Sequence, residues 1–478
     1  MSIRDEIESN QEVIKEKIEE LGVELGKDPE NLELLRRRGS LYIQANKLDL
    51  ASKDILKCVE MNPQDAESYF LLYEIAIFKN DYSQALKFVN KAIKINPEKP
   101  KYYHFKGFIH HQREEYELAL INYEHALSLD PIIGAPRTYF KRGDTYRAMN
   151  EIDNAIEEYE KAIDSVNQLY EIGQVTPEEQ PYPYLYQFYL HLGHAYKSKS
   201  DYKAALKCYN QVIELIPDNN LGYYHRGMLR KDLNKIDEAL VDFNLIIDRD
   251  PENYEYYYLR GECHLIQQNY EAAIKDSSDA ISLGISEPSR FLFHFSRGNA
   301  YFFSGKYDKA ILDFTTTIEL NPEDTQALLN RGNCYMAIKN LDNALADYNK
   351  ALKFRSDYIS ALRNRSLIYI EKNKLELAVA DLEKVDSLMT QKDPSVHFNL
   401  AIGHLKLNNL SKALGYMEPL LNQYPDDPRI LYNYARILGS QNQIKKATKI
   451  LQQAITLQSD FYQYAQADPV LSKVLKNL

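Results

Sequence analysis

Apolar residues recur along this chain at intervals of three and four residues, within blocks that repeat about every 34 residues. One block shows this spacing at Tyr335, Ile338, Leu341, Leu345 and Tyr348. Such spacing places side chains on one face of an α-helix. Many blocks end in a proline, which lacks the N–H that a helix interior requires. Each block is therefore expected to fold as two helices that form a hairpin.

An alanine holds the same place in every block, and seven of the eleven intervals between these alanines are 34 residues. When the alanine is numbered 20 within its block, eight blocks carry glycine at position 8. Small residues at both positions would let the two helices approach closely, with larger residues at positions 4, 11 and 24 around them. A period of this kind predicts one structural unit stacked on copies of itself. The alanines are Ala51, Ala85, Ala119, Ala155, Ala205, Ala239, Ala273, Ala310, Ala344, Ala378, Ala413 and Ala447.

The segment GNCYMAIKNLDNALADYNKAL, residues 332–352, shows the repeated pattern best. Its glycine, tyrosine and alanine positions resemble those of the tetratricopeptide repeat family, and twelve such units can be placed along the chain. The resemblance implies an all-α fold, a right-handed α-solenoid superhelix of stacked hairpins with a concave groove lined by the first helix of each repeat. We therefore expect a capping helix at 1–31, repeats 1–4 at 32–163, repeats 5–12 at 186–461 and a second capping helix at 462–478.

Residues 164–185 interrupt the period between the fourth and fifth repeats. Pro177, Pro181 and Pro183 exclude a continuous helix here. The second helix of the fourth repeat is expected to continue past Leu169, and a loop should follow it. This loop is either a docking site or hinge, or an insertion that the fold tolerates, and the sequence leaves both interpretations open.

Composition narrows the classes of partner. The net charge of −11 disfavours nucleic acid, and a mean hydropathy of −0.50 without a long apolar run disfavours direct insertion into a membrane. The four cysteines, Cys58, Cys208, Cys263 and Cys334, occur without CxxC pairing. Buried thiols in a reducing compartment fit this distribution better than disulfides or zinc, so a cytoplasmic location is expected.

Arginine recurs at position 7, and wherever it does, position 23 of the same repeat is acidic. Where position 7 is apolar, position 23 is apolar too, as in Leu72 with Phe88 and Leu192 with Cys208. The two positions behave as one contact, because a guanidinium held between two helices requires a carboxylate partner. We therefore predict structural ion pairs between Arg38, Arg142, Arg226, Arg260, Arg297, Arg331 and Arg365 and their partners Asp54, Glu158, Asp242, Asp276, Asp313, Asp347 and Asp381.

Catalytic signatures are missing from the sequence. It has no phosphate-binding glycine loop, no GxSxG and no HExxH. His191 and His194 are spaced to share a helix face, but no carboxylate or cysteine arrangement completes a metal motif around them. The sequence therefore predicts a protein that is not an enzyme and that holds neither a metal nor a cofactor.

Function is then expected in the groove, at positions 2, 5, 6, 9, 12 and 13 of each first helix. These positions are unusually aromatic, which indicates a surface that binds a protein, a peptide or another copy of the chain, although contact with neighbouring repeats would also account for it. The candidate groove residues are Phe70, Phe78, Phe105, Phe108, Phe140, Tyr224, Tyr258, Phe295 and Phe302.

Asparagine marks position 6 of the last four repeats, at Asn330, Asn364, Asn399 and Asn433. An amide at each step could hold the backbone of an extended peptide, as a similar ladder does in O-linked N-acetylglucosamine transferase, although asparagine is also common there in the family. Asn299 with Asn330, and Asn333 with Asn364, also match part of the carboxylate clamp with which some members bind chaperone C-termini. The lysine positions of that clamp hold Phe295 and Leu329 instead.

These observations predict a protein–protein interaction scaffold or adaptor that binds an extended or helical protein segment in its concave groove, with self-association possible. Two alternatives stay open. One is a co-chaperone for large chaperone C-termini, which the incomplete clamp disfavours. The other is the targeting subunit of a separate enzyme.

Overall fold

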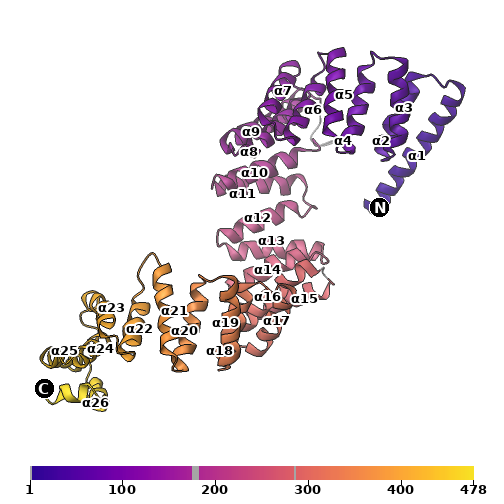
Figure 1. The fold of residues 1–478 in the computed structure, drawn as a ribbon. Helices are drawn as coiled ribbons and strands as arrows, with labels where there is room; N and C mark the ends of the chain where they lie inside the picture. Colours follow the sequence, from indigo (N-terminus) through magenta and orange to yellow (C-terminus); the bar gives the residue numbers. More distant parts are fainter. Residues whose placement is uncertain (1–2, 175–181, 285–286) are drawn as a thin grey trace. The chain divides into compact units, whose positions relative to one another are not determined.

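The computed structural model describes residues 3–174, 182–284 and 287–478, and every regular element within these ranges is a helix (Figure 1). The all-α fold of stacked hairpins is thus confirmed. The chain forms two compact units, residues 1–242 and 243–478, and the boundary falls inside α13. The helices before the boundary are α1 Ile3–Lys27, α2 Leu32–Gln44, α3 Leu48–Met61, α4 Ala66–Phe78, α5 Tyr82–Ile95, α6 Pro100–Gln112, α7 Tyr116–Leu129, α8 Ala135–Ala148, α9 Ile152–Glu171, α10 Leu185–Ser198, α11 Tyr202–Leu215 and α12 Leu221–Asp232, followed by α13 Ile236–Arg249.

The second unit continues with hairpins of the same kind. Its helices are α14 Tyr254–Ile266, α15 Tyr270–Ser282, α16 Glu287–Phe303, α17 Tyr307–Leu320, α18 Thr325–Ala337, α19 Leu341–Phe354, α20 Ile359–Glu371, α21 Leu375–Leu388, α22 Pro394–Lys406, α23 Leu410–Gln423, α24 Pro428–Ser440, α25 Ile444–Leu457, α26 Asp460–Ala467 and α27 Leu471–Leu475.

A left-handed residue ends the first helix of most hairpins, and it is often asparagine. Asn46 has φ 54°, and the N–H of the next residue, Lys47, donates to the carbonyl of Tyr42 at 2.8 Å. This bond satisfies a carbonyl that the helix end leaves free, and asparagine tolerates the left-handed region better than most residues. The same conformation occurs at Asn80, Asn150, Asn234, Asn373, Asn408 and Asn442.

The residue at position 8 is small because an aromatic ring of the second helix lies against it. A Cβ atom on Gly332 would stand 2.6 Å from Cε1 of Tyr348, and one on Gly143 would stand 2.7 Å from Cε1 of Tyr159. The alanines at position 20 are almost entirely buried. The close helix approach predicted from positions 8 and 20 is therefore confirmed, and the ring at position 24 fills the space that the glycine leaves.

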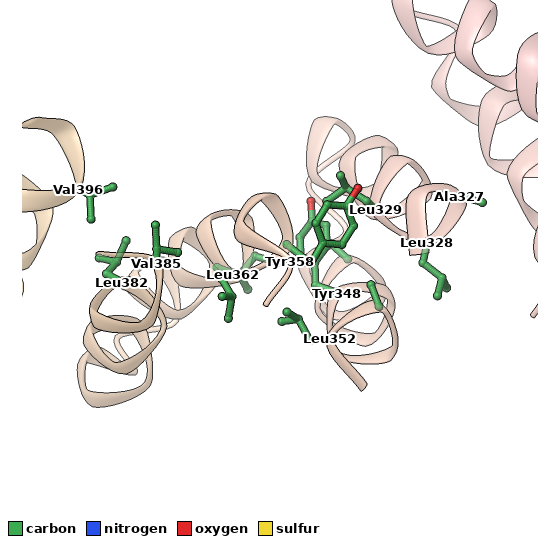
Figure 2. Packing of buried hydrophobic residues seen from close by; sticks show 14 of the residues in the cluster. Ala327, Leu328, Leu329, Tyr348, Leu352, Tyr358, Leu362, Leu382, Val385 and Val396 are labelled. Carbon is green, nitrogen blue, oxygen red and sulfur yellow. The ribbon is translucent and has the colours of Figure 1, made fainter. Parts of the chain in front are cut away.

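The core continues from one hairpin to the next. In the second unit, a cluster of buried side chains extends from α17 to α22, and Figure 2 shows Leu352, Tyr358 and Leu362 lying between the neighbouring hairpins. Within this cluster, each repeat thus covers the apolar face of its neighbour, as expected for a repeat protein.

The terminal helices cover the outer hairpins. On α1, Leu25 is buried against Leu35 and Cys58 of the first hairpin. At the other end, the sequence predicted one capping helix at 462–478, and this is wrong in detail, because two helices form there. Pro469 disfavours helix at Asp468, whose carboxylate instead accepts the N–H groups that begin α27.

The second helix of the fourth repeat, α9, extends to Glu171, which confirms that it continues past Leu169. Residues 175–181 of the predicted loop lie outside the described residues, so its role as a docking site or hinge stays a prediction.

Candidate functional site

The predicted ion pairs all form between the two helices of their hairpins. Nη2 of Arg331 lies 2.7 Å from Oδ1 of Asp347, and Nε lies 2.9 Å from Oδ2. Burial alone would lower the pKa of Arg331, but the hydrogen bond to Asp347 and the negative charge of that carboxylate together outweigh burial and raise this pKa. The other pairs are Arg38–Asp54, Arg142–Glu158, Arg226–Asp242, Arg260–Asp276, Arg297–Asp313 and Arg365–Asp381. These arginines hold hairpins together and do not form a basic surface stripe.

A hollow of the first unit opens between the first helices of its repeats. It has a volume of about 640 Å³ and receives side chains from α2, α4, α6, α8 and α10. Four of the predicted groove residues, Phe78, Phe105, Phe108 and Phe140, lie on its wall. The side chain of Phe78 is 60% exposed. An apolar surface that is open to water therefore exists where the sequence predicted one.

Two predicted groove residues are buried, which corrects their interpretation as open surface. Phe70 is 4% exposed, and its ring lies 5.2 Å from that of Tyr73 and 5.3 Å from that of Phe105. Phe140 is 5% exposed and stacks on Phe188 at 4.6 Å. These rings fill the space between neighbouring first helices, which is the contact with the array's own neighbours that the sequence left open.

The remaining predicted aromatic residues are half-buried and do not line this hollow. Tyr258 packs edge-on against Phe293, and Phe302 packs edge-on against Tyr307. Conversely, Tyr184 lines the hollow although it lies in the segment that the sequence treated as an insertion.

The charged residues of this hollow differ from one side to the other. α8 contributes Arg137 and Lys141, which are four residues apart and share a helix face, and α4 contributes Glu74. His104, between them on α6, shares a hydrogen bond with the Thr138 hydroxyl at 2.9 Å. Burial, with the nearby cations, lowers the pKa of His104 to about 4, so that this side chain is neutral at pH 7.

Position 6 of one repeat contacts position 9 of the preceding repeat. Nδ2 of Asn330 donates to Oδ1 of Asn299 at 2.8 Å, and Nδ2 of Asn364 donates to Oδ1 of Asn333 at 2.7 Å. The predicted asparagines thus lie together in pairs that join adjacent repeats. Asn433 instead donates to the carbonyl of its own helix at Arg429.

Asn399 lies apart from these pairs, in a hollow of about 340 Å³ beside Phe398 and Tyr424. The clamp lysine positions remain unsuited to a carboxylate, because Leu329 is buried and Phe295 packs against Phe314.

Histidines take the same inter-repeat positions in the first unit. Nε2 of His194 lies 3.2 Å from Nδ1 of His225, and Nδ1 of His191 lies 2.9 Å from Oδ1 of Asp144. Burial and the neighbouring histidines lower the pKa of His194 to about 3, and burial lowers that of His225 to about 4. The His194–His225 contact requires one nitrogen to accept, so it is lost when both rings are protonated.

The histidine pair should therefore make folding weaken in acid. Between pH 6.5 and 4 the unfolded chain takes up protons that the folded pair resists, so stability falls as the pH falls. Replacing both histidines with asparagine (His194→Asn, His225→Asn) copies the Asn299–Asn330 pair. The number of protons taken up on unfolding sets the slope of the unfolding free energy against pH, and the double variant should lower that number by up to about two. Urea unfolding at a series of pH values measures this slope. An unchanged slope in the double variant would show that the pair does not control it.

All four cysteines are buried as free thiols, and burial raises the pKa of Cys58 to about 11. In the part of the chain that is described, no three histidine, cysteine or acidic side chains come together as a metal site would require. None of the described helices is both long and apolar enough to cross a membrane.

Comparison with known proteins places these features in a family. Models of the tetratricopeptide repeat match residues 33–65, 66–99, 100–132, 136–165, 186–219, 224–281, 295–359 and 404–468. A tetratricopeptide repeat-containing protein of Methanocaldococcus jannaschii is 30% identical over 150 residues, which cover 28% of this chain and 26% of the relative. The chain thus matches about a quarter of that relative's length.

Two solved structures are similar at low identity. A tetratricopeptide repeat protein of Parabacteroides merdae is 19% identical with a TM-score of 0.42, over 57% of this chain and 99% of that one. Yeast Tom70 is 17% identical with a TM-score of 0.34, over 94% of this chain and 99% of that one. The repeat models, matched along most of the chain, show that this protein belongs to the tetratricopeptide repeat family, whose members are protein-interaction scaffolds.

Proposed function

We propose that this protein is an interaction scaffold that holds a segment of a partner protein in the hollow between α2, α4, α6, α8 and α10. The observation that supports this most is the apolar wall. Phe78 and Phe108 contribute to this wall from successive repeats. The hollow has a volume of about 640 Å³, which lies in the range of sites that bury a ligand. A bulky apolar side chain of a partner would remove this wall from water, and such burial contributes about 25 cal/mol per Å².

A photo-crosslinking residue in place of Phe78 tests this proposal in the source cell. Phe78 is 60% exposed at the hollow, whereas Leu56, on α3, is 47% exposed and does not line it, so Leu56 serves as the control position. Defined partner adducts should form from position 78 and not from position 56, and Phe108→Glu should abolish them without lowering the melting temperature. Adducts that form equally from both positions, or that survive Phe108→Glu, would contradict the proposal.

The asparagine ladder supports a second binding surface less strongly. Asn330 and Asn364 each already use an amide N–H on the preceding repeat, which leaves fewer groups for a peptide backbone. The co-chaperone alternative is disfavoured by the apolar residues at the clamp lysine positions. The targeting-subunit alternative stays a prediction, and a cytoplasmic location is a proposal that the buried thiols support.

A further inference from the structure

The hollow of the first unit has a cationic side, an apolar floor and an anionic side. Arg137 and Lys141 on α8 form the cationic side. Phe105 and Phe108 on α6 contribute to the floor, and Glu74 on α4 forms the opposite side. Because α6 lies between α4 and α8 along the repeats, the two charged sides flank the phenyl rings.

Arg137 is available to a ligand carboxylate. Its guanidinium carbon lies 4.1 Å from the centroid of the Tyr184 ring, and the guanidinium also interacts with the Tyr182 side chain. Among the described residues, Arg137 makes no ion pair with a carboxylate. Lys141 pairs with Asp144 at 3.0 Å, but Asp144 also accepts hydrogen bonds from Tyr159 and shares one with His191. Arg137, unlike Lys141, can therefore form a bidentate contact with a ligand carboxylate without first breaking a native ion pair.

Glu74 is available to a ligand cation. Lys101, the cation whose charge acts on Glu74, is itself paired with Glu67 at 2.7 Å. In the described part of the chain, Glu74 makes no ion pair of its own. Burial raises its pKa, which means that the surroundings disfavour the carboxylate while it stands alone. An incoming ammonium would reverse that effect.

We propose that the partner segment carries a bulky apolar side chain at its centre, a basic residue on the side of Glu74 and an acidic residue on the side of Arg137. This rests on the proposed function, and it adds the sign and the order of the charges. Packed helices lie about 8–10 Å apart, so two steps from α4 to α8 span about 20 Å. An extended chain covers about 3.3 Å per residue, which places the two charged residues about six positions apart.

A tryptophan-containing peptide provides a direct probe, because this protein has no tryptophan. The probe is acetyl-Lys-Ser-Leu-Trp-Leu-Ser-Glu-amide, and its tryptophan fluorescence reports burial on titration with the full chain. Three relatives replace the lysine, the glutamate or both with glutamine. The charged peptide should bind about three- to tenfold more tightly than the peptide with glutamine at both ends, since exposed and half-buried ion pairs contribute modestly.

Protein variants assign each charge to its side. Arg137→Gln should weaken the glutamate-bearing peptides several-fold and leave the others unchanged, and Glu74→Gln should do the same for the lysine-bearing peptides. The controls Lys207→Gln on α11 and Glu117→Gln on α7 remove matched charges from exposed residues that do not line the hollow, and they should change nothing.

Two results would overturn the inference in distinguishable ways. If all four peptides bind alike and neither Arg137→Gln nor Glu74→Gln discriminates among them, the charge pattern is wrong while apolar binding in the hollow stands. If no peptide, including the one with glutamine at both ends, changes its fluorescence at millimolar protein, the proposed function fails for this surface and the inference fails with it.

Discussion

Arg331→Leu should destabilise the protein by about 3 kcal/mol, because it leaves Asp347 buried without its cation. The Asp347 side chain is 6% exposed, and its carboxylate accepts hydrogen bonds from both Nε and Nη2 of Arg331. Water therefore cannot fully replace the guanidinium that the variant removes. Adding Asp347→Leu should recover much of this loss, since two apolar residues need only each other. The first unit already contains such a solution in Leu72 and Phe88, which take the same two positions. Urea or thermal unfolding of the two single variants and the double variant gives the coupling energy.

Lys350→Leu is the matched control for this cycle, because it removes an exposed cation from the same hairpin and should change stability by less than about 0.5 kcal/mol. If the losses of Arg331→Leu and Asp347→Leu simply add in the double variant, the two side chains do not act as a pair. Such a result would also undermine the six equivalent pairs, since all of them join positions 7 and 23.

The hairpins could be predicted from sequence because each depends on contacts that recur. Gly332 against Tyr348 and Arg331 against Asp347 are separated by 16 residues in the chain, and the same separation returns in other repeats. A contact that is repeated many times leaves a period and a correlation in a single sequence. A feature that occurs once leaves no period and no correlation between positions. The break at Pro469 between α26 and α27 is such a feature.

The candidate site was predicted only in part, because burial depends on neighbours that the period does not specify. Phe70 and Phe105 are both aromatic residues of a first helix, yet Phe70 is enclosed by three rings while Phe105 also borders the hollow. Tyr184, which lies under Arg137, comes from the segment outside the repeats. The separation of 31 residues between Asn299 and Asn330 and between Asn333 and Asn364 was a usable signal of contact, and it was interpreted as part of a clamp.

Deleting residues 462–478 should make the second unit aggregate, because it uncovers the last hairpin. Leu471 and Val474 are fully buried in a cluster with Leu438 and Leu451. Burying one such side chain contributes about 1.5–3 kcal/mol, so the loss of two is a large fraction of ordinary stability. The deletion also removes Asp468, which lies 2.7 Å from Nε of Arg436, and leaves that guanidinium half-buried without its carboxylate.

Light scattering after gel filtration, together with the melting temperature, measures the effect of this deletion. The control is a deletion of residues 476–478 alone, which are exposed and follow α27, so that it shortens the chain without uncovering the cluster. The short deletion should stay monodisperse at an unchanged melting temperature, whereas the long one should form larger species or melt earlier. A long deletion that behaves like the short one would mean that α24 and α25 do not need their cover, and the capping role of α26 and α27 would be refuted.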